Sequence, residues 1–287
     1  MITVPPDARL VRLQKGSKRP TFFMVDSYPY FLDVVKLLGT HQPIVSLIGY
    51  EEILRTGHYT IEHEAAQHVD TIVRQQLREP YVIGGCSASA LVAYETAQQL
   101  IARGLEVQLL VLFDMPNPYF MREYSRLRMT LHFYHEQLHR LRLSEFPGWV
   151  VETCKDVAIK HSRRLLRILD NKTSADAFDP SEARIAVAGR YRPAPYPGDV
   201  LLVKRCREVL VGRYRDPQYG WGDTIKGKLE ICEVNSVEHL DLFKSASDRE
   251  LVVKSLRTHL SDTVDPYILE PLPSAGLVHK SHVGHLQ

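Results

Sequence analysis

Short apolar segments alternate with amphipathic segments along most of this chain, and this alternation limits the fold more than any other feature. Strands that alternate with helices form a mostly parallel sheet covered by helices on both faces. The expected strands are Thr21–Val25, Pro43–Leu47, Tyr81–Ile83, Val107–Phe113, Asp199–Lys204 and Leu229–Val234. The expected helices are Tyr30–Leu38, Ile61–Leu77, Ala88–Arg103, Ser181–Arg190 and Ser247–Leu260, with Gly104 as a C-cap. The sequence therefore predicts an α/β fold.

One long segment interrupts this alternation. Residues Pro116–Pro180 show no strand pattern and contain two long helical patterns. Insertions of this length are usually functional, so we expect a helical lid over about residues 117–180, the alternative being a surface embellishment. His132, His135 and His139 share one helical face there and are interpreted as a polar lid surface, not as metal ligands. Residues 1–262 are expected to form one domain, followed by a flexible tail over 263–287.

The composition excludes several classes of protein. The 287 residues carry a formal net charge of +2, with no basic tract that would indicate nucleic-acid binding. No apolar run has the length of a membrane span, and Met1–Lys18 lacks the apolar core of a signal peptide. The four cysteines are scattered without metal-type spacing. We therefore expect a cytoplasmic protein without a metal site.

The run Tyr81–Ser89 has the pattern of a nucleophile elbow. A short apolar strand passes through two glycines into Ser87, and helix-forming residues follow at once. In α/β-hydrolases such a turn raises a serine hydroxyl above the sheet. Gly85 lies two residues before Ser87, as the pattern requires, but Ser89 stands where it has a second glycine. Small residues at a strand–helix junction can also serve packing alone, so Ser87 is a candidate nucleophile on this pattern.

A serine nucleophile needs a base, and the base needs an orienting acid. Asp114 directly follows an apolar strand, where a turn or N-cap role is the alternative. His239 lies in the loop between the last strand and the terminal helix, where a hydrolase base belongs. The order Ser87, Asp114, His239 is that of α/β-hydrolases. Asp216 and Asp223, after the penultimate strand, are alternative acids, although either can be a turn residue.

Several motifs in order resemble the thioesterase domains of nonribosomal peptide synthetases and polyketide synthases, and the related type II thioesterases. The resemblance covers about residues 9–260. It is carried by Arg19–Val25, Gly84–Ser87 with Ala93–Glu95, Tyr191–Gly198, Asp216 with Gly220–Trp221, and Glu238–His239. It implies an α/β-hydrolase fold with a helical lid, and it places the acid of a catalytic triad at Asp114.

The resemblance also implies an oxyanion hole, for which this chain has an altered loop. The family's His-Pro-X-Gly-Gly-like loop is replaced by Asp26–Pro29, and Pro29 has no N–H to donate. The expected donors are the backbone amides of Ala88 and Tyr28, with Ser27 in reserve, and Ser27 and Cys86 are expected to contact substrate. An acidic Asp26 near a developing oxyanion would slow catalysis, so it must point away or the enzyme is slow or altered.

Taken together, these features predict a serine thioesterase without a cofactor of its own. Its expected substrate is an acyl or peptidyl chain on the phosphopantetheine of a carrier protein, released by hydrolysis or cyclisation. Two alternatives stay open: an acyltransferase with an amine or hydroxyl acceptor, and a catalytically weak carrier-docking module. Basic residues of the expected lid could receive an acidic carrier protein or could form a solvated face. They are Arg122, Arg126, Arg128, Arg140, Arg142, Lys160, Arg163, Arg164 and Arg167.

Overall fold

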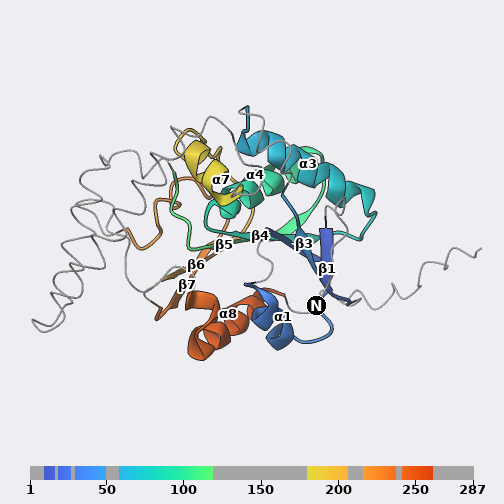
Figure 1. Cartoon of the computed structure of the whole chain (residues 1–287), viewed down its shortest axis with the longest axis vertical. Coiled ribbons are helices and arrows are strands. Elements are labelled where there is room, and N and C mark those ends of the chain that lie inside the picture. The colour runs from blue at the N-terminus through green and yellow to red at the C-terminus, as the bar shows by residue number, and fades with distance from the viewer. Residues whose placement is uncertain are drawn as a thin grey trace, which may run out of the picture.

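The computed structural model describes residues 10–16, 19–26, 30–49, 58–118, 180–205, 216–236 and 241–260. Within them a seven-stranded sheet has the order β1-β3-β2-β4-β5-β6-β7 (Figure 1). The strands are β1 Leu10–Gln14, β2 Phe22–Val25, β3 Ile44–Leu47, β4 Tyr81–Cys86, β5 Val107–Phe113, β6 Val200–Arg205 and β7 Leu229–Val234. β1 pairs with β3 in antiparallel orientation, and all other pairs are parallel. The predicted α/β fold is confirmed.

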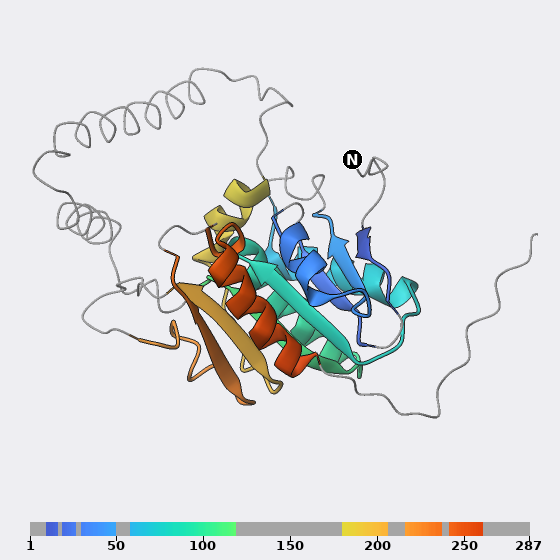
Figure 2. The same cartoon turned by 90° about the horizontal axis from the view of Figure 1, so that it is seen from below.

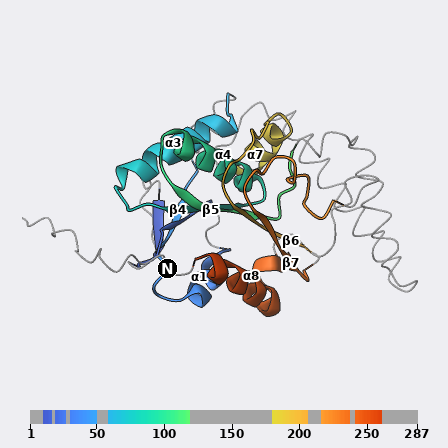
Figure 3. The ribbon, with the colours of Figure 1, turned by 180° about the vertical axis from the view of Figure 1, so that it is seen from behind.

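Helices cover both faces of the sheet. They are α1 Leu32–Leu38, α3 Ile61–Arg74, α4 Ala88–Ala102, α7 Pro180–Ala188 and α8 Ala246–His259, with a short 3₁₀ helix, η3, over Asp241–Phe243. α3, α4 and α7 lie on one face, and α1 and α8 lie on the other, as Figures 1 and 3 show from opposite sides. Figure 2 shows α8 and α1 across the second face from below. All five predicted helices are present, within a few residues of their expected ends.

The central strands are apolar throughout because both faces of the sheet are buried. In β2, Phe23 and Val25 pack in the core cluster beneath α3 and α4. Phe22 and Met24 pack in the opposite cluster with α1 and α8. This two-sided burial is typical of parallel sheets and explains why the sequence shows continuous apolar runs and not a polar–apolar alternation.

One strand and one strand end differ from the prediction by more than a residue. β1 was not predicted, because it is a short edge strand that keeps charged and half-exposed positions such as Arg12. β4 continues three residues beyond Ile83, through a glycine pair that has low strand propensity. Gly84 is required there because a Cβ would lie 2.8 Å from a ring carbon of Phe22 and 2.9 Å from the Met24 sulfur.

The helix after Ser87 ends as predicted. Gly104 has a φ of 80°, and its amide donates to the Ile101 carbonyl at 2.9 Å. The Leu105 amide donates to the Leu100 carbonyl at 3.0 Å. Together these two bonds form a Schellman motif, which needs the left-handed backbone that glycine adopts without strain.

The expected lid over residues 117–180 and the expected tail over 263–287 fall almost entirely outside the described residues. The histidine-bearing face of the lid and its basic residues fall outside them too. None of the helices in the described part of the chain combines the length and the apolar composition that crossing a bilayer requires. The same residues hold no group of three His, Cys, Asp or Glu side chains placed to bind a metal ion.

Candidate active site

Three neighbouring strands end in residues with an unusual backbone. Asp26 follows β2, Ser87 follows β4 and Asp114 follows β5, with φ values of 50°, 56° and 49°. The strand register pairs Val25 with Gly85 and Cys86 with Phe113, so the three residues lie side by side at the carboxyl edge of the sheet. Positive φ outside glycine is uncommon and concentrates at functional sites.

Each of these three residues continues the hydrogen bonding of the sheet. The Asp26 amide donates to the Leu47 carbonyl at 2.8 Å, and the Ser87 amide donates to the Phe113 carbonyl at 2.9 Å. The Asp114 amide donates to the Val203 carbonyl at 2.7 Å. The strained turns are therefore fixed by the neighbouring strand, which is how a fold holds a backbone that is costly in isolation.

Ser87 has the geometry of a nucleophile elbow. It joins β4 directly to α4, with φ 56° and ψ −136°, and its side chain makes no capping hydrogen bond to the helix. The Ser87 hydroxyl therefore does not cap the helix, which is the usual structural role of a serine at this position. Ala88 is the first residue of α4, so its amide has no acceptor within the helix and lies at the positive end of the helix dipole.

Gly85 permits the close approach of β4 and α4. A Cβ at this position would overlap the Ser89 carbonyl oxygen and would lie 2.9 Å from the Ala90 Cα. These atoms belong to the backbone and cannot turn aside. Small residues in the elbow are thus required by packing, whatever their role in chemistry.

Gly85→Ala is expected to lower the free energy of unfolding by about 1–3 kcal/mol, because the helix must move away from the strand. Urea denaturation measures this change. Gly189→Ala is the matched control, since a Cβ at Gly189 meets nothing within 4 Å. The control is expected to change stability by less than about 1 kcal/mol. Equal stability of both variants would contradict the close-packed elbow.

Asp114 is a buried carboxylate with a cationic partner. Its side chain has no exposed surface, and Arg205 Nε lies 2.6 Å from its Oδ2. The Tyr219 hydroxyl lies 3.5 Å from Oδ1. A buried charge is costly unless it is paired, and Arg205 supplies the pair from the end of β6, the neighbouring strand. Arg205 was not predicted. Its position at the carboxyl end of an apolar strand, at the same edge of the sheet as Asp114, could have indicated it.

The alternative acids occupy a different kind of position: Asp223 is exposed, and Asp216 is bonded within a turn. The Asp216 carboxylate accepts hydrogen bonds from the amides of Gln218 at 2.8 Å and Gly220 at 2.6 Å, which fixes a turn. That turn leads to Trp221, which stacks on Tyr94 and donates from its indole to the Met115 carbonyl at 2.8 Å. Asp216 therefore has a structural role that explains its presence.

A second buried charge cluster lies beside the carboxyl ends of β2 and β3. Arg184 of α7 reaches Asp26 Oδ2 at 2.5 Å through Nη1, and it binds Glu64 of α3 through Nε at 3.0 Å and also through Nη2. The Tyr59 hydroxyl donates to Glu64 at 2.7 Å, and His68 Nε2 lies 3.6 Å from the same carboxylate. The Asp26 carboxylate is thus directed to Arg184. Arg184 and Glu64 were not predicted.

The pKa of Glu64 predicts a loss of stability in acid. Burial acts to raise this pKa, but hydrogen bonds with His68 and Arg184, and the charges of both, outweigh burial and lower it from 4.5 to about 2. A pKa lowered in the folded state gives stability that is complete above about pH 4.5 and is lost as the pH falls toward 2.

This loss amounts to about 3 kcal/mol at most, from the size of the shift. The free energy of unfolding is measured by denaturant titration from pH 5 to pH 2. Glu64→Gln is expected to remove this part of the pH dependence. Glu62→Gln, an exposed position on the same helix, is expected to keep it. An identical pH profile for Glu64→Gln and the native chain would contradict this role of Glu64.

The structure brings together only part of the predicted site. Ser87, Ala88, Cys86 and Asp114 meet at the carboxyl edge of the sheet, whereas His239, Tyr28 and Ser27 lie outside the described residues. The Cys86 side chain is half-buried against the core cluster beneath α1 and α8. Burial and, to a lesser extent, the charge of Asp114 raise the pKa of its thiol, so Cys86 stays protonated beside the serine.

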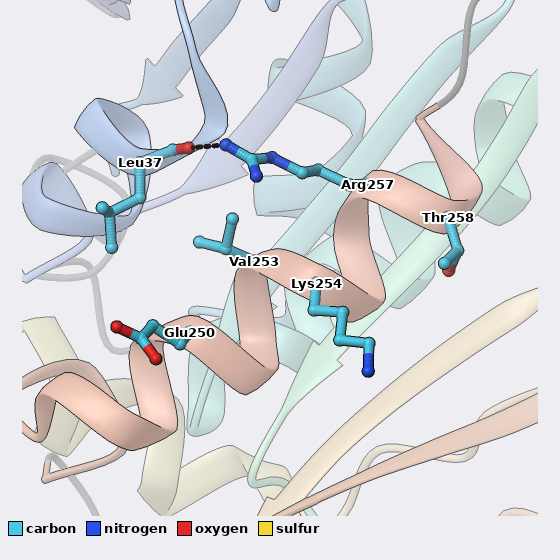
Figure 4. A pocket seen from close by; sticks show the side chains of 6 residues that line it. All are labelled: Leu37, Glu250, Val253, Lys254, Arg257 and Thr258. Atoms are coloured by element: carbon cyan, nitrogen blue, oxygen red, sulfur yellow. Dashed lines mark hydrogen bonds between the residues drawn. The ribbon is translucent and has the colours of Figure 1, made fainter.

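A pocket of about 430 Å³ lies on the helical face formed by α1 and α8 (Figure 4). It is lined by Leu37 and by residues of α8 from Glu250 to Thr258, and Arg257 donates a hydrogen bond to the Leu37 carbonyl. The end of α8 lies near the start of β5, because Gln108 bonds to the His259 carbonyl at 2.9 Å. The pocket is therefore separate from the edge that carries Ser87.

Comparison with known families identifies the same fold. A family model described as a thioesterase domain matches residues 35–152. The NocB thioesterase domain, solved as a covalent complex with a fluorophosphonate nocardicin G analogue, has a TM-score of 0.60. It is 19% identical, over 88% of this chain and 100% of that one. The type II thioesterase BorB from the borrelidin biosynthetic cluster has a TM-score of 0.56 at 15% identity, over 90% of this chain and 98% of that one.

The related sequences include non-reducing polyketide synthases. Non-reducing polyketide synthase 1 of Elsinoe fawcettii is 34% identical over 188 residues, which are 62% of this chain and 8% of that protein. Non-reducing polyketide synthase CTB1 of Cercospora beticola is 33% identical over 109 residues, 37% of this chain and 5% of that protein. The chain thus spans a small fraction of the curated relatives it matches. The predicted resemblance to thioesterase domains and the α/β-hydrolase fold are confirmed.

Proposed function

We propose that this chain is a serine thioesterase that releases an acyl chain from the phosphopantetheine of a carrier protein. The observation that carries the proposal is the elbow at Ser87, with a buried carboxylate, Asp114, at the end of the next strand. The thioesterase-domain match over residues 35–152 includes both residues. The matched relatives are named non-reducing polyketide synthases, so a polyketide thioester is the first substrate to test.

In the proposed mechanism, Ser87 Oγ attacks the thioester carbonyl while His239 accepts its proton. The amides of Ala88 and Tyr28 stabilise the tetrahedral oxyanion. The C–S bond then breaks, and His239 returns the proton to the departing thiol, which leaves an acyl-enzyme on Ser87. Water attacks the ester in the same way and releases the acid, or an internal hydroxyl does so and releases a ring. Asp114 orients the imidazole and stabilises its charged form.

The residues around the expected base support this assignment. β7 ends at Val234, and the chain continues from the carboxyl edge of the sheet toward His239. Asp248, a buried residue in the first turn of α8, accepts a hydrogen bond from the Asn235 amide at 2.9 Å and another from the Ser236 hydroxyl. The described chain resumes at Asp241, where η3 begins.

Thiol release from N-acetylcysteamine thioesters of polyketide acids tests the function, with products identified by mass spectrometry. A free acid or a lactone supports hydrolysis or cyclisation. An ester or amide formed with an added acceptor favours the acyltransferase alternative. A folded chain that releases no thiol from any of these thioesters, or from a carrier-bound one, would contradict the proposal and favour a docking module.

A further inference from the structure

Asp26 lies where a negative charge would harm the proposed reaction. The register of β2 on β4 pairs Val25 with Gly85, which places Asp26 level with Cys86, one residue before the nucleophile. Neighbouring strands are about 4.8 Å apart, so the Asp26 carboxylate can reach the space in front of Ser87. An oxyanion forming in that space is stabilised by positive potential and opposed by a carboxylate.

Arg184 fixes the position of this carboxylate. Its Nη1 lies 2.5 Å from Asp26 Oδ2, and its Nε and Nη2 both bind Glu64. The Arg184 side chain is 1% exposed and the Glu64 side chain is fully buried, whereas the Asp26 side chain keeps 28% of its surface. The arginine is thus held rigidly by the buried acid, and Asp26 is the exposed partner that it fixes.

The surrounding backbone is adapted to this arginine. A Cβ at Gly49, which follows β3, would collide with Arg184 Nη2 and would lie 3.1 Å from Glu64 Oε1. The Tyr59 hydroxyl donates at 2.7 Å to Glu64 Oε2, the oxygen that also accepts from Arg184 Nε. The guanidinium therefore fills a space between α3, α7 and the end of the sheet. Several contacts fix its orientation toward Asp26.

We infer that Arg184 is a positioning residue of the active site: it holds the Asp26 carboxylate away from the developing oxyanion. The inference rests on the proposed function. It assigns a role to a residue of α7 that contacts neither the nucleophile nor its acid. It also explains how an acidic residue can replace the usual loop sequence beside an oxyanion hole.

The test removes the buried ion pair and leaves Asp26 without its partner. In Glu64→Gln/Arg184→Met both buried charges are removed together, a change that folded proteins often tolerate. We expect kcat on an N-acetylcysteamine thioester to fall roughly 15- to 50-fold, because the released Asp26 carboxylate can turn toward the oxyanion. This is the effect of one unit charge roughly 7–10 Å away at an effective dielectric of about 20. KM is expected to change less than about threefold, because the charge acts on the transition state.

Adding Asp26→Asn to this double variant is expected to restore kcat to within about threefold of the native value. Asparagine tolerates the positive φ of residue 26, so the backbone is preserved. Asp70→Asn is the matched control, because it removes a surface carboxylate from an ion pair with Arg103, at 2.7 Å. A purely structural role for Arg184 would give no recovery on adding Asp26→Asn, and that result would overturn the inference.

Asp26→Asn in the otherwise native chain tests the inference even if the double variant fails to fold. We expect less than a threefold change in kcat, because Arg184 already holds the carboxylate away from the oxyanion. An increase of tenfold or more would show that the charge opposes catalysis in the native chain and would overturn the inference. These outcomes are separate from a failure of the proposed function, in which the native chain itself releases no thiol.

Discussion

Replacing Ser87 with alanine is expected to lower kcat for thioester cleavage by at least about 1,000-fold. The acyl-enzyme cannot form without the hydroxyl, and only the remaining oxyanion donors and substrate binding would accelerate the attack of water. The side chain makes no hydrogen bond that caps α4, so its removal is expected to leave the fold unchanged. Steady-state thiol release measures the loss, and the thermal midpoint checks the fold.

Ser89→Ala is the control for this substitution. Ser89 is a second serine in the same turn and is 9% exposed. It takes part in no step of the proposed mechanism. Its replacement is expected to change kcat less than about fivefold, since it removes a hydroxyl that the proposed mechanism does not use. If Ser87→Ala kept most of the activity and Ser89→Ala lost it, the elbow would have been assigned to the wrong residue.

Asp114→Asn is expected to lower kcat by about 1,000- to 10,000-fold. The amide cannot stabilise a charged imidazole and favours the wrong tautomer of His239. The substitution also removes the ion pair between Asp114 and the Arg205 guanidinium, which lies 2.6 Å from the carboxylate. A loss of about 1–3 kcal/mol in the free energy of unfolding is therefore expected as well. Activity is compared at a temperature at which the variant is shown to be folded.

Asp216→Asn separates the two candidate acids. The Asp216 carboxylate accepts hydrogen bonds from two backbone amides of a turn, so its replacement is expected to lower the thermal midpoint and to leave kcat within about fivefold. The reverse pattern, with activity lost in Asp216→Asn and kept in Asp114→Asn, would assign the acid to the later loop.

Much of the fold could be predicted because local patterns agree with the global structure. Five helices and six strands were expected from periodicity, since each central strand is buried on both faces and reads as a continuous apolar run. β1 was not predicted because an edge strand keeps one face polar, so that its sequence resembles that of a loop. The end of β4 was not predicted because Gly84 and Gly85 have low strand propensity. They are required there by the close approach of Phe22 and Ser89.

The site could be predicted where chemistry follows directly from position along the chain. Ser87 and Asp114 end neighbouring strands, so the strand assignment alone placed them together. Arg184 could not be found in this way, because it is 158 residues away from Asp26 in the sequence and lies on a helix with no motif. Its partnership depends on how α7 packs on α3, which local sequence does not encode.

The most direct test of the central proposal is the mass of the intact chain after reaction with a serine-directed fluorophosphonate, followed by peptide mapping. The proposed mechanism predicts one covalent adduct per chain, on the peptide that contains Ser87, and no adduct on the folded Ser87→Ala variant. An unlabelled native chain that is shown to be folded, or an adduct mapped to another residue, would contradict it.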